Sequence, residues 1–130
     1  MVPNSSDVGW WMTSSQLRIV TDSSSDLSPG VSQAFGIEVV PLNLHFGQEV
    51  FVDGELTAEQ FWARARRPHP PKTSQPAVGQ YEQVYDPLVA AGHQVLCVTL
   101  TGKHSGTFNS AHLAAQRFDE AVRVLSLIHI

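Results

Sequence analysis

The chain has a single cysteine, Cys97, so no disulfide can join two parts of it. This residue lies inside the apolar run Val-Leu-Cys-Val-Thr-Leu at residues 95–100, a setting typical of a buried thiol that packs as a small hydrophobic side chain. A protein without disulfides suits a reducing compartment. We therefore expect Cys97 to be buried and the protein to be cytoplasmic.

Basic residues are also few, with 8 lysines and arginines against 12 aspartates and glutamates and a net charge of −4. The one basic cluster consists of Arg64, Arg66 and Arg67, which we expect to form a solvated helix end. Nucleic acids and anionic membrane surfaces require a basic patch, and this composition argues against both as partners.

Long hydrophobic runs are absent as well. Residues 1–16 lack the basic start and the apolar stretch of a signal peptide, and no segment has the length and apolar character of a bilayer-crossing helix. We expect residues 1–16 to form a flexible leader. The histidines His45, His69, His93 and His112 are spread without the spacing of metal ligands, so the sequence predicts neither a metal site nor a cofactor.

At 130 residues the chain has the size of one domain, in which short apolar runs alternate with amphipathic stretches. This alternation predicts an α/β fold with a mainly parallel sheet flanked by helices. Pro41 disfavours a central ladder position, so its run should be an edge or bulged strand, and Pro87 should kink or divide its helix. Strands are expected at residues 17–21, 37–46, 50–52, 95–100 and 122–125, and helices at residues 29–35, 57–67, 77–91 and 105–118.

Local signals mark several boundaries. Ser28 before Pro29 predicts a capped helix start, and Thr57 with Gln60 matches a capping box. Residues 47–48 should close a hairpin, and residues 68–76 should form a stiff proline-rich loop. The last helix is expected to turn a set of side chains toward the sheet, namely Ala111, Leu113, Ala114 and Phe118.

The most informative segment follows the run at residues 95–100. There Ser105, Gly106 and Thr107 open the last predicted helix. A strand that turns into a helix presents free N–H groups at the positive end of the helix dipole, which attracts an anion. The hydroxyls of Ser105 and Thr107 add donors, and Gly106 allows close approach to the backbone. The segment therefore predicts a seat for a carboxylate or a phosphate.

Two further polar loops have the same chemical character. Lys-Thr-Ser-Gln-Pro at residues 72–76 precedes a predicted helix, and Thr-Asp-Ser-Ser-Ser-Asp-Leu at residues 21–27 follows the first strand. Loops that leave the same end of a parallel sheet converge on one crevice, so the three should meet.

A purely structural interpretation stays open for these polar residues. Ser105, Thr107 and Thr73 each suit the cap of a following helix. Asp22 and Asp26 suit a cap of the loop after the first strand, or a role in orienting the neighbouring serine hydroxyls, and we favour that structural role.

Taken in order, five motifs resemble the N-terminal domain of DegV-type fatty-acid-binding proteins. They are Val-Thr-Asp-Ser-Ser-Ser-Asp-Leu at residues 20–27, Val-Val-Pro-Leu-Asn-Leu at 39–44, Val-Asp-Gly at 52–54, Thr-Ser-Gln-Pro at 73–76 and Ser-Gly-Thr-Phe-Asn-Ser-Ala at 105–111. Each motif is weak alone, but the ordered set is specific.

The resemblance implies a carrier that binds a long-chain fatty acid and has no catalytic nucleophile of its own. By resemblance, Thr73 and Ser105 hydrogen-bond the acyl carboxylate, and a separate fatty-acid kinase phosphorylates the carboxylate on the carrier. His104 departs from the family, which has an apolar residue there, and so puts the usual ligand in question. The further candidate ligand residues are Ser74, Gly106, Thr107 and Ser23.

The resemblance also implies a missing half. In the family a second domain supplies a histidine and basic residues to the carboxylate, so residues 17–125 would form a DegV-like N-terminal domain without that partner. Residues 126–130 do not resemble the family and are expected to mark a truncation point.

Other functions fit the residues less well. A hydrolase with Ser105 as nucleophile and His104 as base lacks the required elbow, because Gly102 lies three positions before the serine instead of two. A phosphate-binding P-loop around Gly102 and Lys103 lacks both its earlier glycine and its hydroxyl residue. A module for a small carboxylate or phosphate remains open, and an apolar tunnel leading from Ser105 would distinguish fatty-acid binding from it.

Overall fold

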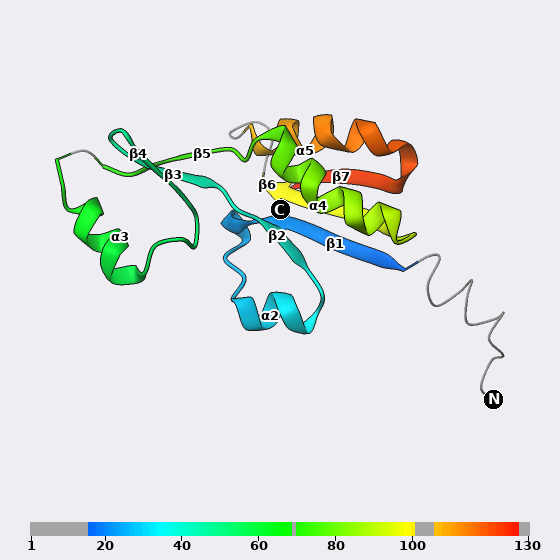
Figure 1. Cartoon of the computed structure of the whole chain (residues 1–130), viewed down its shortest axis with the longest axis horizontal. Coiled ribbons are helices and arrows are strands. Elements are labelled where there is room, and N and C mark those ends of the chain that lie inside the picture. The colour runs from blue at the N-terminus through cyan, green and yellow to red at the C-terminus, as the bar shows by residue number, and fades with distance from the viewer. Residues whose placement is uncertain (1–15, 69, 101–105, 128–130) are drawn as a thin grey trace.

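A computed structural model describes residues 16–68, 70–100 and 106–127 of the chain. Within them the structure is α/β, with a four-stranded parallel sheet and a separate three-stranded antiparallel sheet (Figure 1). The strands are β1 (Leu17–Asp22), β2 (Glu38–Val40), β3 (Asn43–Phe46), β4 (Glu49–Val52), β5 (Lys72–Ser74), β6 (Gln94–Leu100) and β7 (Val122–Leu127). The helices are η2 (Ser23–Ser25), α2 (Pro29–Ala34), α3 (Ala58–Ala65), α4 (Val78–Ala90), α5 (Thr107–Ala115) and η3 (Gln116–Ala121).

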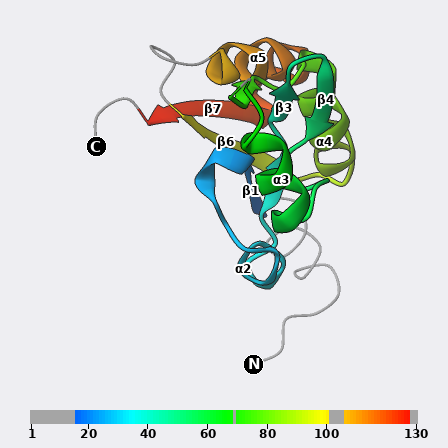
Figure 2. The ribbon, with the colours of Figure 1, turned by 90° about the vertical axis from the view of Figure 1, so that its left-hand side faces the viewer.

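The parallel sheet has the strand order β2-β1-β6-β7, so β1 and β6 lie at its centre. The chain passes from β1 outward to β2 and from β6 outward to β7, in opposite directions. Right-handed crossovers then place α2 and α5 on opposite faces of the sheet, and both views show α5 and α2 on opposite sides of it (Figures 1 and 2). The predicted parallel α/β fold is confirmed.

The core lies between one face of this sheet and the helices α4 and α5, which cover that face. Val20 of β1 and Cys97 of β6 are paired in register, and neither is exposed. Tyr81 and Tyr85 of α4 pack on the same cluster. The burial of Cys97 confirms the expectation from the sequence. Leu113 is 45% exposed, so its predicted inward orientation is wrong, whereas Ala111 and Ala114 are buried as predicted.

The opposite face of the parallel sheet keeps apolar side chains near the surface. Strand alternation turns Leu96 and Val98 away from α4 and α5, and both are only partly buried. Leu125 is paired with Val98 on this face and is 52% exposed. The six-residue helix α2 leaves Leu125 uncovered, and Val31 of α2 is itself 42% exposed. An apolar surface thus remains accessible beside the carboxyl ends of β6 and β7.

The antiparallel sheet has the order β4-β3-β5 and, together with α3, projects from the parallel sheet as an arm made of residues 43–74 (Figure 1). Phe61 of α3 packs against Phe46 with ring centroids 5.6 Å apart. Thr57 caps α3 by accepting from the Gln60 N–H, while the Gln60 side chain accepts from the Thr57 N–H, so the predicted capping box is confirmed. The hairpin prediction is also confirmed, because β3 and β4 pair antiparallel.

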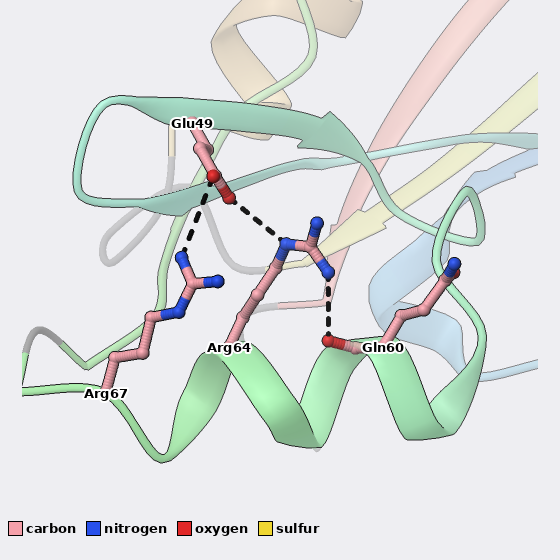
Figure 3. Close-up of polar contacts among 4 residues, drawn as sticks. All are labelled: Glu49, Gln60, Arg64 and Arg67. Atoms are coloured by element: carbon pink, nitrogen blue, oxygen red, sulfur yellow. Dashed lines mark hydrogen bonds and ion pairs between the residues drawn. The ribbon is translucent and has the colours of Figure 1, made fainter.

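The basic cluster at the end of α3 is not merely solvated. Arg64 donates to a Glu49 carboxylate oxygen at 3.1 Å (Figure 3). The Arg64 guanidinium also lies over the Phe51 ring, 4.9 Å from its centroid. Arg67 lies 3.7 Å from the other Glu49 oxygen. The predicted solvated helix end is therefore wrong for Arg64, which fastens α3 to β4, and holds for the exposed Arg66.

Four elements differ from their prediction, and for two of them the reason is strand pairing that overrides local signals. The expected strand at residues 37–46 is split near Pro41 into β2 and β3, which belong to different sheets. The expected loop at residues 68–76 contains β5, which exists because it pairs with β3. Helix α4 is not divided at Pro87, and the Ala91 N–H bonds the Pro87 carbonyl at 3.1 Å. Strand β7 reaches Leu127, two residues past its predicted end.

Candidate functional site

The strand order makes the carboxyl ends of β1 and β6 the expected place for a ligand site. In open α/β sheets, ligands bind where neighbouring strands send their connections to opposite sides. The strands β1 and β6 meet this condition. The Thr21 hydroxyl donates to the Val98 carbonyl at 2.9 Å and joins the two strands close to this edge. The loop that begins at Ser23 and the segment leading to α5 both leave this edge.

The loop after β1 is held by its own polar side chains. The Asp22 carboxylate accepts from the Ser24 N–H at 2.9 Å and also from the Ser24 hydroxyl, which confirms the structural role expected for Asp22. The Ser23 hydroxyl oxygen accepts from the Leu42 N–H at 2.9 Å. Ser23 therefore fixes the start of β3 relative to this loop, while its own O–H hydrogen is left to donate.

The loop that carries the Thr-Ser-Gln-Pro motif is anchored on one side and open on the other. The Ser74 hydroxyl lies 2.8 Å from His45 Nε2, and the Asn43 side-chain amide donates to the Gln75 carbonyl at 3.4 Å. Thr73 points to the other face of β5 and is exposed, and no group in the described part of the chain bonds its hydroxyl. Thr73 is thus available to a ligand, whereas Ser74 already contacts a histidine.

The start of α5 is formed by Gly106 and Thr107. Gly106 occupies the cap position with φ −75° and ψ −1° and, as a glycine, supplies no side-chain cap of its own. Thr107 is fully buried as the first helical residue, so it does not occupy the cap position that the structural interpretation left open for it. Ser105 and His104 lie outside the described residues.

The two motif loops meet at Gly106. A Cβ atom on this glycine would collide with Gln75 Oε1 and Cδ and would lie 2.7 Å from Gln75 Nε2. The Gln75 carboxamide thus occupies the space in which any other residue at position 106 would place its side chain. Sequence reasoning missed Gln75, although it lies inside the quoted motif and has two amide donors.

Beneath this edge lies a buried polar group of side chains. Within the described residues, Asp22 Oδ2 and the Tyr81 hydroxyl have no hydrogen-bond partner, and the Tyr85 hydroxyl donates to the Ala111 carbonyl at 3.2 Å. Burial is the largest cause that raises the pKa of both tyrosines, and burial raises the pKa of Cys97 to about 11. The thiol therefore stays protonated near neutral pH and does not act as a nucleophile there.

Two features are absent from the part of the chain that the structure describes, a metal-binding cluster and a membrane-spanning helix. No group of three or more histidine, cysteine, aspartate or glutamate side chains there could hold a metal ion. Among the same residues, no helix combines the length and apolar character needed to span a bilayer.

A groove of about 470 Å³ lies along α5 and β7 and is lined in part by Leu96, His112, Arg123 and Leu125.

The sequence is similar to that of a known protein family. The profile described as uncharacterised protein, DegV family, matches residues 16–126. A DegV domain-containing protein of Staphylococcus aureus (strain MRSA252) is 39% identical over 108 residues, which cover 82% of this chain and 39% of the relative.

Solved structures agree with that assignment. A fatty-acid-binding DegV family protein from Thermus thermophilus superposes with a TM-score of 0.77 at 34% identity, covering 85% of this chain and 40% of that one. A fatty-acid (stearic acid)-binding protein from Eubacterium ventriosum gives a TM-score of 0.75 at 32% identity, covering 85% and 41%. The chain thus spans about 40% of the length of these proteins.

Proposed function

The chain belongs to the DegV family, and from this premise we propose that it binds a long-chain fatty acid and holds the ionised carboxylate between two loops. Thr73 and Ser105 are the proposed hydroxyl donors, with the backbone around Gly106 and Thr107 supplying further N–H groups. The observation that carries the proposal is the contact between the Gln75 carboxamide and Gly106, because it joins the Thr73 loop to the start of α5. Ser23 and Ser74 are secondary candidates, since each hydroxyl already has a protein contact.

The chemistry of a fatty acid explains why such a site needs two parts. Its charged head must be hydrogen-bonded when it leaves water, because an unpaired buried charge is strongly unfavourable. Its tail contributes about 0.8 kcal/mol for each buried methylene, so about fourteen methylenes supply on the order of 11 kcal/mol. Tail burial therefore provides most of the affinity, and the head-group donors fix the orientation of the ligand.

The surface for the tail is proposed to be the uncovered face of the parallel sheet. Leu125 and Leu127 on this face are 52% and 41% exposed and lie at the carboxyl end of β7. In a parallel sheet this is the same edge from which the segment leading to α5 leaves β6. A tail that starts at the two loops can therefore continue over the exposed apolar side chains of Leu125 and Leu127.

The biological role that follows is that of a cytoplasmic carrier without its own catalytic nucleophile. We infer that it presents the head group to a fatty-acid kinase, which supplies the phosphoryl chemistry. The chain spans about 40% of its relatives, so we also infer that a C-terminal domain completes the head-group site and the tail channel. The 130-residue chain should then bind lipid more weakly than a two-domain protein.

Native mass spectrometry tests the proposal. The chain is incubated with palmitate and, in separate samples, with acetate and inorganic phosphate. We expect a palmitate adduct that the double variant Thr73→Ala, Ser105→Ala loses, while the control Ser32→Ala on α2 keeps it. Equal palmitate occupancy in the double variant would refute the assigned head-group site. Adducts with phosphate or acetate but none with palmitate would favour a small-anion module instead.

A further inference from the structure

The carboxamide of Gln75 lies where the two loops meet and packs against Gly106. Its three outer atoms surround the position of a Cβ on Gly106. No hydrogen bond of this carboxamide is found among residues 16–68, 70–100 and 106–127. Gln75 is exposed, so its two N–H donors and its carbonyl are accessible from outside the fold.

The backbone at Gln75 is held firmly, so only the side-chain torsions of Gln75 set the position of its carboxamide. The preceding residues pair with β3, and Asn43 donates to the Gln75 carbonyl at 3.4 Å. Pro76 follows, is fully buried, and restricts Gln75 to an extended backbone. The loop therefore presents the carboxamide from a fixed base, and a ligand has little backbone freedom to remove.

The direction of the side chain also agrees with that of Thr73. Side chains two residues apart on an extended backbone point to the same side. Ser74 points to the opposite side, where it contacts His45 at 2.8 Å. Thr73 and Gln75 consequently share a side of the loop, and Gln75 meets Gly106 there.

We propose that Gln75 is a further head-group residue, which donates an N–H to the bound carboxylate and selects an ionised head over a neutral one. This inference rests on the proposed function and names a specificity residue for the same site. Gly106 is needed because a side chain at that position would displace the carboxamide. The free donors, the fixed backbone and the N-terminal turn of α5 all favour a singly charged oxyanion as the bound group.

NMR titrations of the ¹⁵N-labelled 130-residue chain with octanoate and with octanol test the inference. Both probes are soluble and contain eight carbon atoms, so their apolar areas are about equal and they differ mainly in the head group. Wild-type protein should bind octanoate more tightly than octanol. Gln75→Ala should weaken octanoate binding about tenfold, the loss expected for one charge-assisted hydrogen bond, and leave octanol binding unchanged. Gln75→Glu, which keeps the shape but adds a negative charge, should weaken octanoate binding at least as much.

The outcomes separate the inference from the proposed function. Gln33→Glu on α2 is the matched charge control and should bind both probes as the wild type does. If octanoate shifts the resonances around Thr73 and Gly106 but binds equally to wild type, Gln75→Ala and Gln75→Glu, the inference is refuted while the proposed function stands. Equal weakening of octanoate and octanol would indicate a structural role and also refute it. If octanoate shifts neither loop, both fail.

Discussion

Replacing Gly106 by alanine perturbs the contact on which the site assignment depends. The backbone of Gly106 has φ −75°, a value that alanine adopts without strain. The effect of the substitution therefore comes from two sources. Alanine is a poorer helix cap than glycine, and the new Cβ would collide with the Gln75 carboxamide.

A double-mutant cycle separates these two sources. The loss of the glycine cap is the same whether residue 75 is glutamine or alanine, so it cancels in the cycle. The collision exists only with glutamine. Gln75 is exposed and can rotate away at a cost of about 0.5–1.5 kcal/mol, less than the penalty of overpacking a rigid core. We therefore predict a coupling free energy of about 1 kcal/mol between positions 75 and 106.

The assay is urea unfolding followed by circular dichroism of the wild type, Gly106→Ala, Gln75→Ala and the double variant. Gly106→Ala should lower the free energy of unfolding more in the Gln75 background than in the Gln75→Ala background. Additive effects, with a coupling smaller than about 0.3–0.5 kcal/mol, would show that the two loops do not touch as described. The head-group site would then lose its main structural support.

Three further predictions concern the stability of the fold. Thr57→Ala should lower the free energy of unfolding by about 1 kcal/mol in a urea titration, because it removes the cap of α3; an unchanged value would show that the capping box is not formed. Arg64→Ala should destabilise more than Glu49→Gln in the same titration, since Arg64 also covers Phe51 while exposed ion pairs contribute about 0–1 kcal/mol; the reverse order would contradict the packing role. Burial raises the pKa of Cys97 from 9.0 to about 11, so the stability that the protonated thiol contributes is complete below pH 9 and is lost as the pH rises through 11. Cys97→Ala should reduce this loss between pH 9 and 10 in urea titrations, because the raised pKa values of Tyr81 and Tyr85 add their own loss only above pH 10; an identical slope in the variant over that interval would contradict it.

Local signals in the sequence predict the starts of helices well, because the groups that make a cap are neighbours in the chain. Ser28 accepts from the Val31 N–H, and Thr57 pairs with Gln60, each within one turn. The parallel sheet is likewise predictable, because alternating strands and helices permit few arrangements. The burial of Cys97 follows from its apolar run.

Features that depend on distant partners are not predictable in this way. The three residues of β5 form a strand only because β3 offers them a pairing edge, and nothing in the local proline-rich sequence indicates this. The division of residues 37–46 between two sheets likewise depends on which strands pair with each half. The ion pair of Arg64 with Glu49, which fastens α3 to β4, likewise forms only in the folded chain.

The candidate site shows the same division. The motifs around Thr73 and Ser105 are readable in the sequence, and strand order explains why their loops leave one edge of the fold. The contact between Gln75 and Gly106 joins residues from separate elements, so only the folded chain reveals it. A glycine before a helix is usually explained by backbone freedom, whereas Gly106 has an ordinary helical φ and is required by the side chain packed on it.

The central claim is that the charged end of a fatty acid lies between these two loops. Intermolecular nuclear Overhauser effects between octanoate and the labelled chain test it most directly. The account predicts contacts from the methylene next to the octanoate carboxylate to the Gln75 side-chain amide and the Gly106 α protons, and none from the terminal methyl group. Contacts of the terminal methyl group with Gln75 and Gly106 would contradict the account.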